Sequence, residues 1–449
     1  MAIEHALRKE HISFVVCTTT LAEGVNIPIK YLFLTTFSLG TSSVQIRKIQ
    51  NMVGRTARSG IHTEGSAIVT DPKFYDKRLD WRGGGKYKWA DCKKMFDYGN
   101  TETCTSAILA LVSNLEIDFK SKYKASAIIS FLIENYSKPS CFSNLASVIQ
   151  DSYRAHVEDD IKYNRYASEI KPKVAQLENV IENVENYLCY IYNSQENTDN
   201  FINTVNLLVT QTYAYFLGND DQKKMLCSIF QLIAQKIISN IEPKEAVYYA
   251  RSLYGIDVSK KILKWSNENI EVLEDYSNSQ LLDSLINLFV ELFPNRVKID
   301  INELKNVSLL WIDGRTFIDI YSNLQEKLTI SQIEKLCSST LSYHLCFLIG
   351  NILDAIDDRA EKLTDKLTLL QKMIKYGVSS RFQILVCENL FDDRPIAKKL
   401  DELYGQILIT DKEFRGLIIA NKLHIINVLN NYPEYFHHKL QFYTLRNTD

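Results

Sequence analysis

Short apolar runs and polar loops alternate over the first seventy residues. Residues 12–17, 31–36 and 65–70 are apolar runs of strand length, and residues 44–52 have the spacing of an amphipathic helix. The run at 12–17 has no polar break, which is typical of a strand buried on both faces of a parallel sheet. The pattern predicts the order strand, loop, strand, helix, strand.

The pattern changes near residue 100, where long amphipathic periods replace the short runs. Nine of the sixteen glycines lie in the first 100 residues. Polar breaks at 193–200 and 219–221 predict loops between helices. The predicted fold class is therefore α/β followed by all-α. Two apolar stripes at helical spacing predict core positions: Val174, Leu177, Val180, Ile181, Val184, Tyr187, Leu188 and Ile191, then Leu226, Ile229, Phe230, Ile233 and Ile237.

Composition is that of a globular chain, and charge is unevenly distributed. The 449 residues are 46% hydrophobic and 11% aromatic, with a net charge of −2. Residues 1–100 hold 15 Lys and Arg against 9 Asp and Glu, a net of +6, so the remainder is at −8. This distribution favours contact of the amino-terminal part with nucleic acid.

Two arginines near a glycine are candidates for chemistry on a phosphate. Arg55 and Arg58 are three residues apart, so on a helical turn both guanidinium groups leave one face. Two cations in that geometry suit a transferring phosphoryl group. A solvated basic face is the alternative for an isolated pair. A threonine-rich loop at 18–20 follows the first apolar run, where open α/β sheets bind ligands.

Two segments resemble motifs of a known family. Residues 18–28, TTTLAEGVNIP, resemble motif V of superfamily 2 helicases, and residues 51–58, NMVGRTAR, resemble motif VI. The form of motif V is similar to that of the superkiller-like branch of these DEAD/DEAH-box-type enzymes, which includes repair and phage-defence helicases. The resemblance is specific over residues 12–71 and implies a RecA-like lobe.

The resemblance implies a role for each matching residue. Arg55 and Arg58 would be catalytic and would reach the terminal phosphate of ATP. Asn51 stands where the family more often has glutamine. The implied nucleotide contacts are Gly24, Asn26, Asn51 and Gly54, and the implied contacts to the nucleic-acid backbone are Thr18 and Thr19.

A complete motor also needs a phosphate-binding loop (Walker A) and an acidic strand end that holds magnesium (Walker B). Neither occurs in this sequence. We therefore expect the chain to be the carboxyl-terminal part of a helicase, inactive as an ATPase without a first lobe supplied in cis or in trans. That missing lobe would hold most of the contacts to ATP and Mg. The expected domains are a partial second RecA-like lobe at 1–104, a helical connector at 105–240 and a helical domain at 241–449.

Within the helical part, several segments carry further expectations. Such helicases often have a winged-helix-like connector after the second lobe, and the resemblance implies that residues 124–153 hold its short helices. Trp311 and Gly314 form a Trp-x-x-Gly segment similar to one in superkiller-like helicases, which implies that Trp311 stacks on a base; a packed core tryptophan is the alternative. Residues 376–377 and 391–394 resemble segments near the end of defence-type helicases.

The remaining features narrow the classes of function. Residues 86–89, KYKW, with Lys93 and Lys94 interleave basic and aromatic groups, which suits either a nucleic-acid contact or a solvated loop. Nine cysteines without a Cys-x-x-Cys pair predict free thiols, no metal site and a cytoplasmic location. We expect no membrane contact. The expected partner is single-stranded or unwinding DNA or RNA, and the alternative function is a non-enzymatic nucleic-acid- or protein-binding module derived from a helicase.

Overall fold

The computed structural model divides the chain into two compact units. One unit comprises residues 1–104 and 426–449, and the other comprises residues 105–425. The structure describes residues 12, 14–16, 30–35, 38–39, 42–43, 46–54, 56, 64–70, 75–76, 78–80, 85–97, 99, 106–118, 120–138, 140–195, 197–324, 327–356, 359–405 and 410–445.

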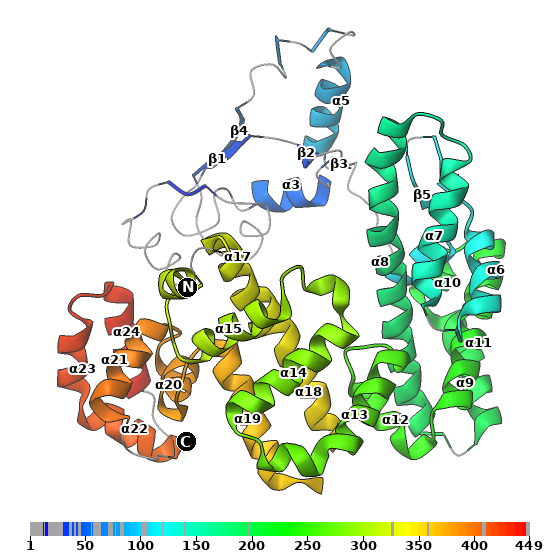
Figure 1. The fold of residues 1–449 in the computed structure, drawn as a ribbon. Helices are drawn as coiled ribbons and strands as arrows, with labels where there is room; N and C mark the ends of the chain where they lie inside the picture. The colour runs from blue at the N-terminus through cyan, green and yellow to red at the C-terminus, as the bar shows by residue number, and fades with distance from the viewer. Residues whose placement is uncertain are drawn as a thin grey trace. The chain divides into compact units, whose positions relative to one another are not determined.

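The first unit contains a small parallel sheet. Strand β1 (Tyr31–Leu34) pairs in parallel with β4 (Ser66–Val69), and helix α3 (Ile46–Val53) lies between them in the chain (Figure 1). This is the strand, helix, strand order expected for residues 31–70. A short antiparallel pair, β2 (Ser38–Leu39) with β3 (Ser42–Ser43), precedes α3.

One face of the sheet is covered by helices. Ile49 and Met52 of α3 form a buried cluster with Leu34 of β1 and with Cys92 of α5 (Gly85–Phe96). These α3 residues are three apart, which places them on one face of the helix. On the opposite face of β1 the side chain of Phe33 is exposed. Among the described residues of the α/β part, this cluster packs the helices against the sheet.

The strand expected at residues 12–17 is not formed by the residues described there. Residues 12 and 14–16 have no strand conformation, and Phe14 and Val16 are 69% and 87% exposed. A buried strand needs a hydrogen-bonded neighbour and covering helices, and an apolar run supplies neither by itself. The prediction of a buried strand at this place is wrong for the described residues.

The described residues of the second unit are mostly helical, with one short antiparallel strand pair among them. The 34-residue helix α8 is its longest element, and Asp159 accepts hydrogen bonds from the first backbone amides of that helix. The elements of this half are η2 (Ala107–Val112), the antiparallel pair β5 (Leu115–Glu116) and β6 (Lys122–Tyr123), α6 (Ala125–Asn135), α7 (Cys141–Arg154), α8 (Asp160–Asn193), α9 (Thr198–Gln211), α10 (Tyr213–Leu217), α11 (Asp220–Asn240), η3 (Pro243–Glu245) and α12 (Ala246–Arg251).

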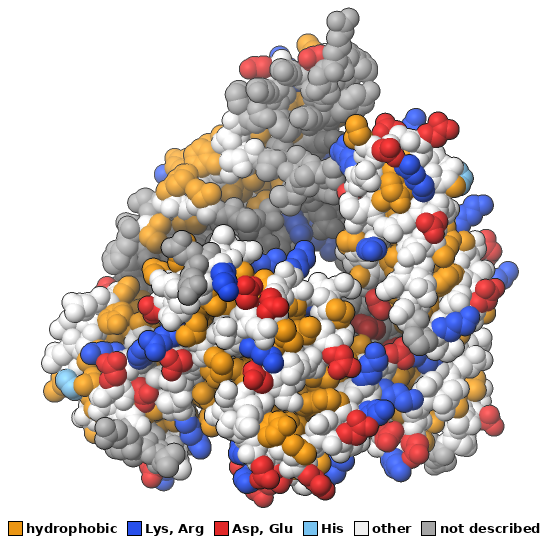
Figure 2. All heavy atoms as spheres, viewed as in Figure 1, with side chains coloured by type: hydrophobic (Ala, Val, Ile, Leu, Met, Phe, Trp, Pro, Cys, Tyr) orange, Lys and Arg blue, Asp and Glu red, His pale blue; other side chains and the backbone are white. Residues whose placement is uncertain are grey.

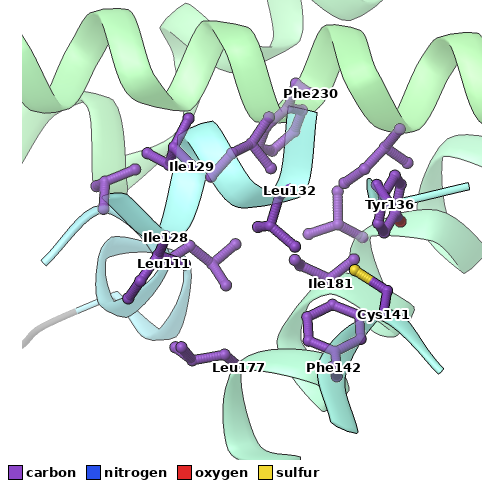
Figure 3. Packing of buried hydrophobic residues seen from close by; sticks show 14 of the residues in the cluster. Leu111, Ile128, Ile129, Leu132, Tyr136, Cys141, Phe142, Leu177, Ile181 and Phe230 are labelled. Atoms are coloured by element: carbon purple, nitrogen blue, oxygen red, sulfur yellow. The ribbon is translucent and has the colours of Figure 1, made fainter. Parts of the chain in front are cut away.

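Both predicted apolar stripes lie in the core of this half. All five stripe residues of α11 are buried, and along α8 Tyr187 departs from the expectation, being 52% exposed. Figure 3 shows side chains from η2, α6, α7, α8 and α11 pointing toward one another around Leu132. Breaks between helices occur at both predicted places but are shorter than predicted: α8 ends at Asn193 and α9 begins at Thr198, and α10 ends at Leu217 and α11 begins at Asp220. Whether residues 124–153 form a winged helix stays a prediction.

The rest of the helical unit continues with shorter helices, some with π-helical turns. Its elements are α13 (Ile256–Asp275), α14 (Asn278–Leu292), η4 (Pro294–Arg296), α15 (Ile301–Ile312), α16 (Phe317–Asn323), α17 (Ile330–Lys335), the π-helical η5 (Leu336–Leu345), α18 (Cys346–Ile356), α19 (Glu361–Tyr376), α20 (Arg381–Leu385), the π-helical η7 (Val386–Leu390), α21 (Arg394–Tyr404), α22 (Asp411–Ala420) and α23 (Lys422–Leu429), which the boundary at residue 425 crosses; α24 (Glu434–Leu445) belongs to the first unit. A small α/β part followed by a large helical domain confirms the predicted fold class.

One continuous helix, residues 330–356, has the length and composition of a membrane span, with a mean hydropathy of 1.3 over its most apolar window. Just over half of that window, 56%, is buried inside the unit. Leu341, Ile349 and Ile352 are among its buried residues, as in a core helix. On the face in view in Figure 2, basic and acidic side chains are interspersed over the helical unit, with apolar side chains between them.

Candidate functional site

The carboxyl end of α3 carries two of the predicted nucleotide-binding residues. Asn51 is exposed in the last turn, and Gly54 follows the helix, with its backbone amide donating to the Gln50 carbonyl oxygen at 2.8 Å. The Thr56 hydroxyl donates to the Val53 carbonyl oxygen at 2.7 Å and caps the helix end.

The other predicted residues of this part lie outside the residues that the structure describes. Their roles stay predictions drawn from the sequence. These residues are Thr18, Thr19, Gly24, Asn26, Arg55 and Arg58.

Trp311, predicted to stack on a base, is packed inside the helical unit. Its side chain is 6% exposed, and its Nε1 donates to the Ile374 carbonyl oxygen at 2.7 Å. The Phe317 ring lies parallel to the indole, with centroids 5.8 Å apart. In this conformation the ring contacts protein groups, and a base-stacking role, which stays a prediction, requires the indole to be uncovered.

Arg394 covers the indole from a third segment. Its guanidinium carbon lies 3.8 Å from the centroid of the Trp311 ring, a cation–π contact. Its Nε donates to the Gly377 carbonyl oxygen at 2.7 Å and its Nη2 to the Arg315 carbonyl oxygen at 2.8 Å. Burial lowers the pKa of this guanidinium from its usual value. Through these two backbone acceptors, the side chain links the start of α21 to the segments at Gly377 and Arg315.

Two glycines permit this packing. Gly377 ends α19 with φ of +62°, and a Cβ at this position would lie 2.4 Å from Cε2 of Trp311. Gly314 has φ of +73° with no atom near its missing side chain. The segments around 311–315, 376–377 and 391–394, noted separately in the sequence, thus meet in one cluster. The first segment is 61 residues from the second and the second is 14 residues from the third, and neither separation signals that they meet.

A buried ion network in the helical unit was not predicted from the sequence. Lys236 of α11 lies 2.8 Å from Glu185 of α8 and 3.0 Å from Asp257 of α13, and the side chains of Lys236 and Glu185 are 6% and 3% exposed. The Tyr136 hydroxyl also donates to Glu185. The only sequence signal is that Lys236 and Glu185 each directly adjoin a residue of an apolar stripe.

This network caps the start of α13. The carboxylate of Glu185 accepts a hydrogen bond from the Ile256 backbone amide at 2.9 Å, and Gly255 precedes that residue without a side-chain cap of its own. A Cβ at Gly255 would lie 2.6 Å from Glu182. Burial, with help from Glu178 and Glu185, raises the pKa of Glu182 to about 7. These contacts connect α6, α8, α11 and α13. Because Glu182 has a raised pKa, the stability of this part of the protein depends on pH.

Comparison with known proteins adds a partial relationship. A stretch of 67 residues is 36% identical to Helicase POLQ-like of Drosophila melanogaster, covering 15% of this chain and 6% of that protein. The chain contains a helicase-related segment. A stretch of 139 residues is 27% identical to the Hachiman protein HamB of Bacillus cereus, covering 30% of this chain and 12% of that protein. No family model matches the chain.

The matched stretches are short on both sides. They span 6% and 12% of the two relatives, so the relatives' own activities do not transfer to this chain by similarity alone. What the matches support is a helicase-derived protein. The assignment of individual residues depends on the motifs and on the geometry described above.

Proposed function

We propose that this chain is part of an ATP-dependent nucleic-acid helicase of superfamily 2. It supplies two catalytic arginines, Arg55 and Arg58, and part of the grip on the strand. ATP and Mg are held mainly by a first lobe outside this sequence.

The order and setting of the two motifs are the observation that carries this proposal. The motif VI segment begins in the last turn of α3, a helix packed against a parallel sheet, and continues beyond a capped helix end. Strand β1 and most of α3 separate the two motifs, and the order of the motifs is that of superfamily 2 helicases. The 36% identity to Helicase POLQ-like supports the same class.

The test uses the natural protein isolated from its own cell. Its intact mass is compared with the 51.8 kDa of this chain to establish whether a first lobe is part of the same polypeptide. ATP hydrolysis stimulated by single-stranded nucleic acid is then measured for Arg55→Ala and Arg58→Ala. Each substitution should lower turnover about a thousandfold or more while strand binding persists, because the arginines stabilise charge on the transferring phosphoryl group.

Arg47→Ala is the matched control, since Arg47 is an exposed arginine on the same helix and lies before the motif. It should retain turnover. Unchanged turnover in both Arg55→Ala and Arg58→Ala would refute the assignment of catalytic arginines.

A second candidate is a binding module derived from a helicase that acts without hydrolysis. The lack of a phosphate-binding loop in this sequence favours it. Under this function the natural protein binds single strands with a steep dependence on salt, because phosphate contacts release counterions, and it shows no ATP hydrolysis.

A further inference from the structure

Helix α5 brings two basic–aromatic pairs together in the α/β part. Trp89 lies on α5, and its ring forms an edge contact with the ring of Tyr75, with centroids 5.8 Å apart at 84°. The guanidinium carbon of Arg78 lies 3.7 Å from the centroid of Tyr75. Lys93, one turn after Trp89 on α5, has its Nζ 5.5 Å from the indole centroid. Two aromatic rings and two cations thus form one cluster.

The aromatic surface of this cluster is available to a ligand. Tyr75 is 57% exposed, although Arg78 covers part of its ring, and Lys93 is also exposed. Trp89 is half-buried, so α5 holds its indole in place while part of it faces outward. Ordered aromatic rings at a surface lose little conformational entropy when a flat ligand stacks on them.

The cluster carries two cations, Arg78 and Lys93, and Asp76 and Asp80 each stand two residues from Arg78 in the sequence. Neither Arg78 nor Lys93 forms an ion pair with a described carboxylate, and Arg78 donates instead to the Tyr75 carbonyl oxygen at 2.7 Å. The first 100 residues carry a net charge of +6. Cations that are not in ion pairs attract a polyanion. The affinity for that polyanion falls as the salt concentration rises.

The combination favours single-stranded nucleic acid over other anions. Single strands offer bases that stack on aromatic rings and phosphates that meet Lys and Arg, and both contacts tolerate any sequence. In a duplex the bases are already stacked on one another, so the aromatic rings would have no partner. An acidic peptide would use the cations and leave the rings without a stacking partner.

We propose that Tyr75, Arg78, Trp89 and Lys93 form a sequence-independent contact site for single-stranded nucleic acid. The inference rests on the nucleic-acid binding of the proposed function. It adds a site to the contacts expected from Thr18 and Thr19.

The test measures binding of the full chain to fluorescein-labelled oligo(dT) and oligo(rU) of about 20 nucleotides by fluorescence anisotropy. Tyr75→Ala and Trp89→Ala should each weaken binding about tenfold, the effect of losing a base–aromatic stack. Lys93→Gln should lower the slope of log K against log salt by about 1, as expected for one phosphate contact. The anisotropy is followed between about 50 and 200 mM salt.

Conservative variants separate stacking from folding. Trp89→Phe keeps an aromatic ring and should retain most of the affinity, whereas Trp89→Leu keeps an apolar side chain and should lose it. Phe216→Ala is the control, because Phe216 is a 78% exposed aromatic of the helical unit that stacks on Tyr213. It should bind like the parent chain, and circular dichroism confirms the helical content of every variant.

The outcomes distinguish this site from the proposed function. If the parent chain binds neither oligonucleotide, the nucleic-acid binding of the proposed function fails and the site fails with it. If the parent binds and the Trp89→Leu, Tyr75→Ala and Lys93→Gln variants match it, only the site is refuted. Displacement of the oligonucleotides by poly-glutamate at equal charge concentration would also overturn the site, since stacking would then contribute nothing.

Discussion

Replacing Lys236 by methionine tests the buried ion network most directly. The substitution keeps a long apolar side chain and removes the ammonium that lies 2.8 Å from Glu185 and 3.0 Å from Asp257. It also removes a cation whose Nζ lies 4.5 Å from the centroid of the Tyr136 ring. The carboxylate of Glu185, 3% exposed, would lose its buried cation.

The expected cost follows from burial. Removing one partner of a buried ion pair costs about 3–5 kcal/mol, because the remaining charge is neither paired nor hydrated. Glu185 still accepts hydrogen bonds from the Tyr136 hydroxyl and the Ile256 amide after the change. We therefore expect a loss near the lower end, about 3 kcal/mol.

Urea unfolding followed by circular dichroism measures this loss. The urea concentration at the midpoint of unfolding should fall. The slope of the unfolding free energy against urea should stay constant, since the substitution changes stability and not the surface exposed on unfolding. Lys122→Met is the matched control, because Lys122 and Glu116 form an exposed pair 2.6 Å apart, and solvent screening should make its loss far less costly than that of the buried pair.

A double variant tests the physical reason. In Lys236→Met with Glu185→Gln the buried charge is gone, while the amide oxygen still accepts from Ile256. The double variant should be more stable than Lys236→Met alone, because the single change leaves an unpaired charge. A cost for Lys236→Met equal to that of Lys122→Met, or a double cost equal to the sum of the singles, would refute the reasoning.

Further predictions concern the Trp311 cluster and Glu182. Gly377→Ala should lower the free energy of unfolding by about 3 kcal/mol, because the added Cβ overlaps Trp311 and φ is positive. Gly314→Ala has open space around it and should lower the free energy of unfolding by about 1 kcal/mol. Equal losses in chemical unfolding would contradict the overlap. The pKa of Glu182 is raised from 4.5 to about 7, so the folded state binds the proton more tightly and stability falls as pH rises through this range. Glu182→Gln should remove that fall and raise stability at pH 8 by up to about 3 kcal/mol, and an unchanged pH slope would contradict this.

The sequence determined the type and order of the elements with strong local patterns. The stripes on α8 and α11 repeat at helical spacing, and nearly all their residues are buried or half-buried, because an amphipathic helix has one face to bury whatever covers it. The strands at 31–34 and 66–69 and the helix between them were likewise predictable. The run at residues 12–17 shows the limit, since burial of a strand depends on neighbours that its own residues do not specify.

The residues of the candidate motor site are predictions from the motifs, and the structure describes Asn51 and Gly54 among them. Only one of the two pairs in the basic–aromatic cluster could be predicted from the sequence. Lys93 and Trp89 are one turn apart and could be paired by spacing, whereas Tyr75 and Arg78 reach them through the packing of a separate segment.

Only the tertiary structure decided which distant residues meet. The cluster around Trp311 joins three segments, and the network around Lys236 joins four helices. Local periodicity reports which face of an element is apolar, because that depends on neighbours three or four residues away. The partner of a buried charge or ring is set by how helices pack across the chain, and no local pattern contains that information.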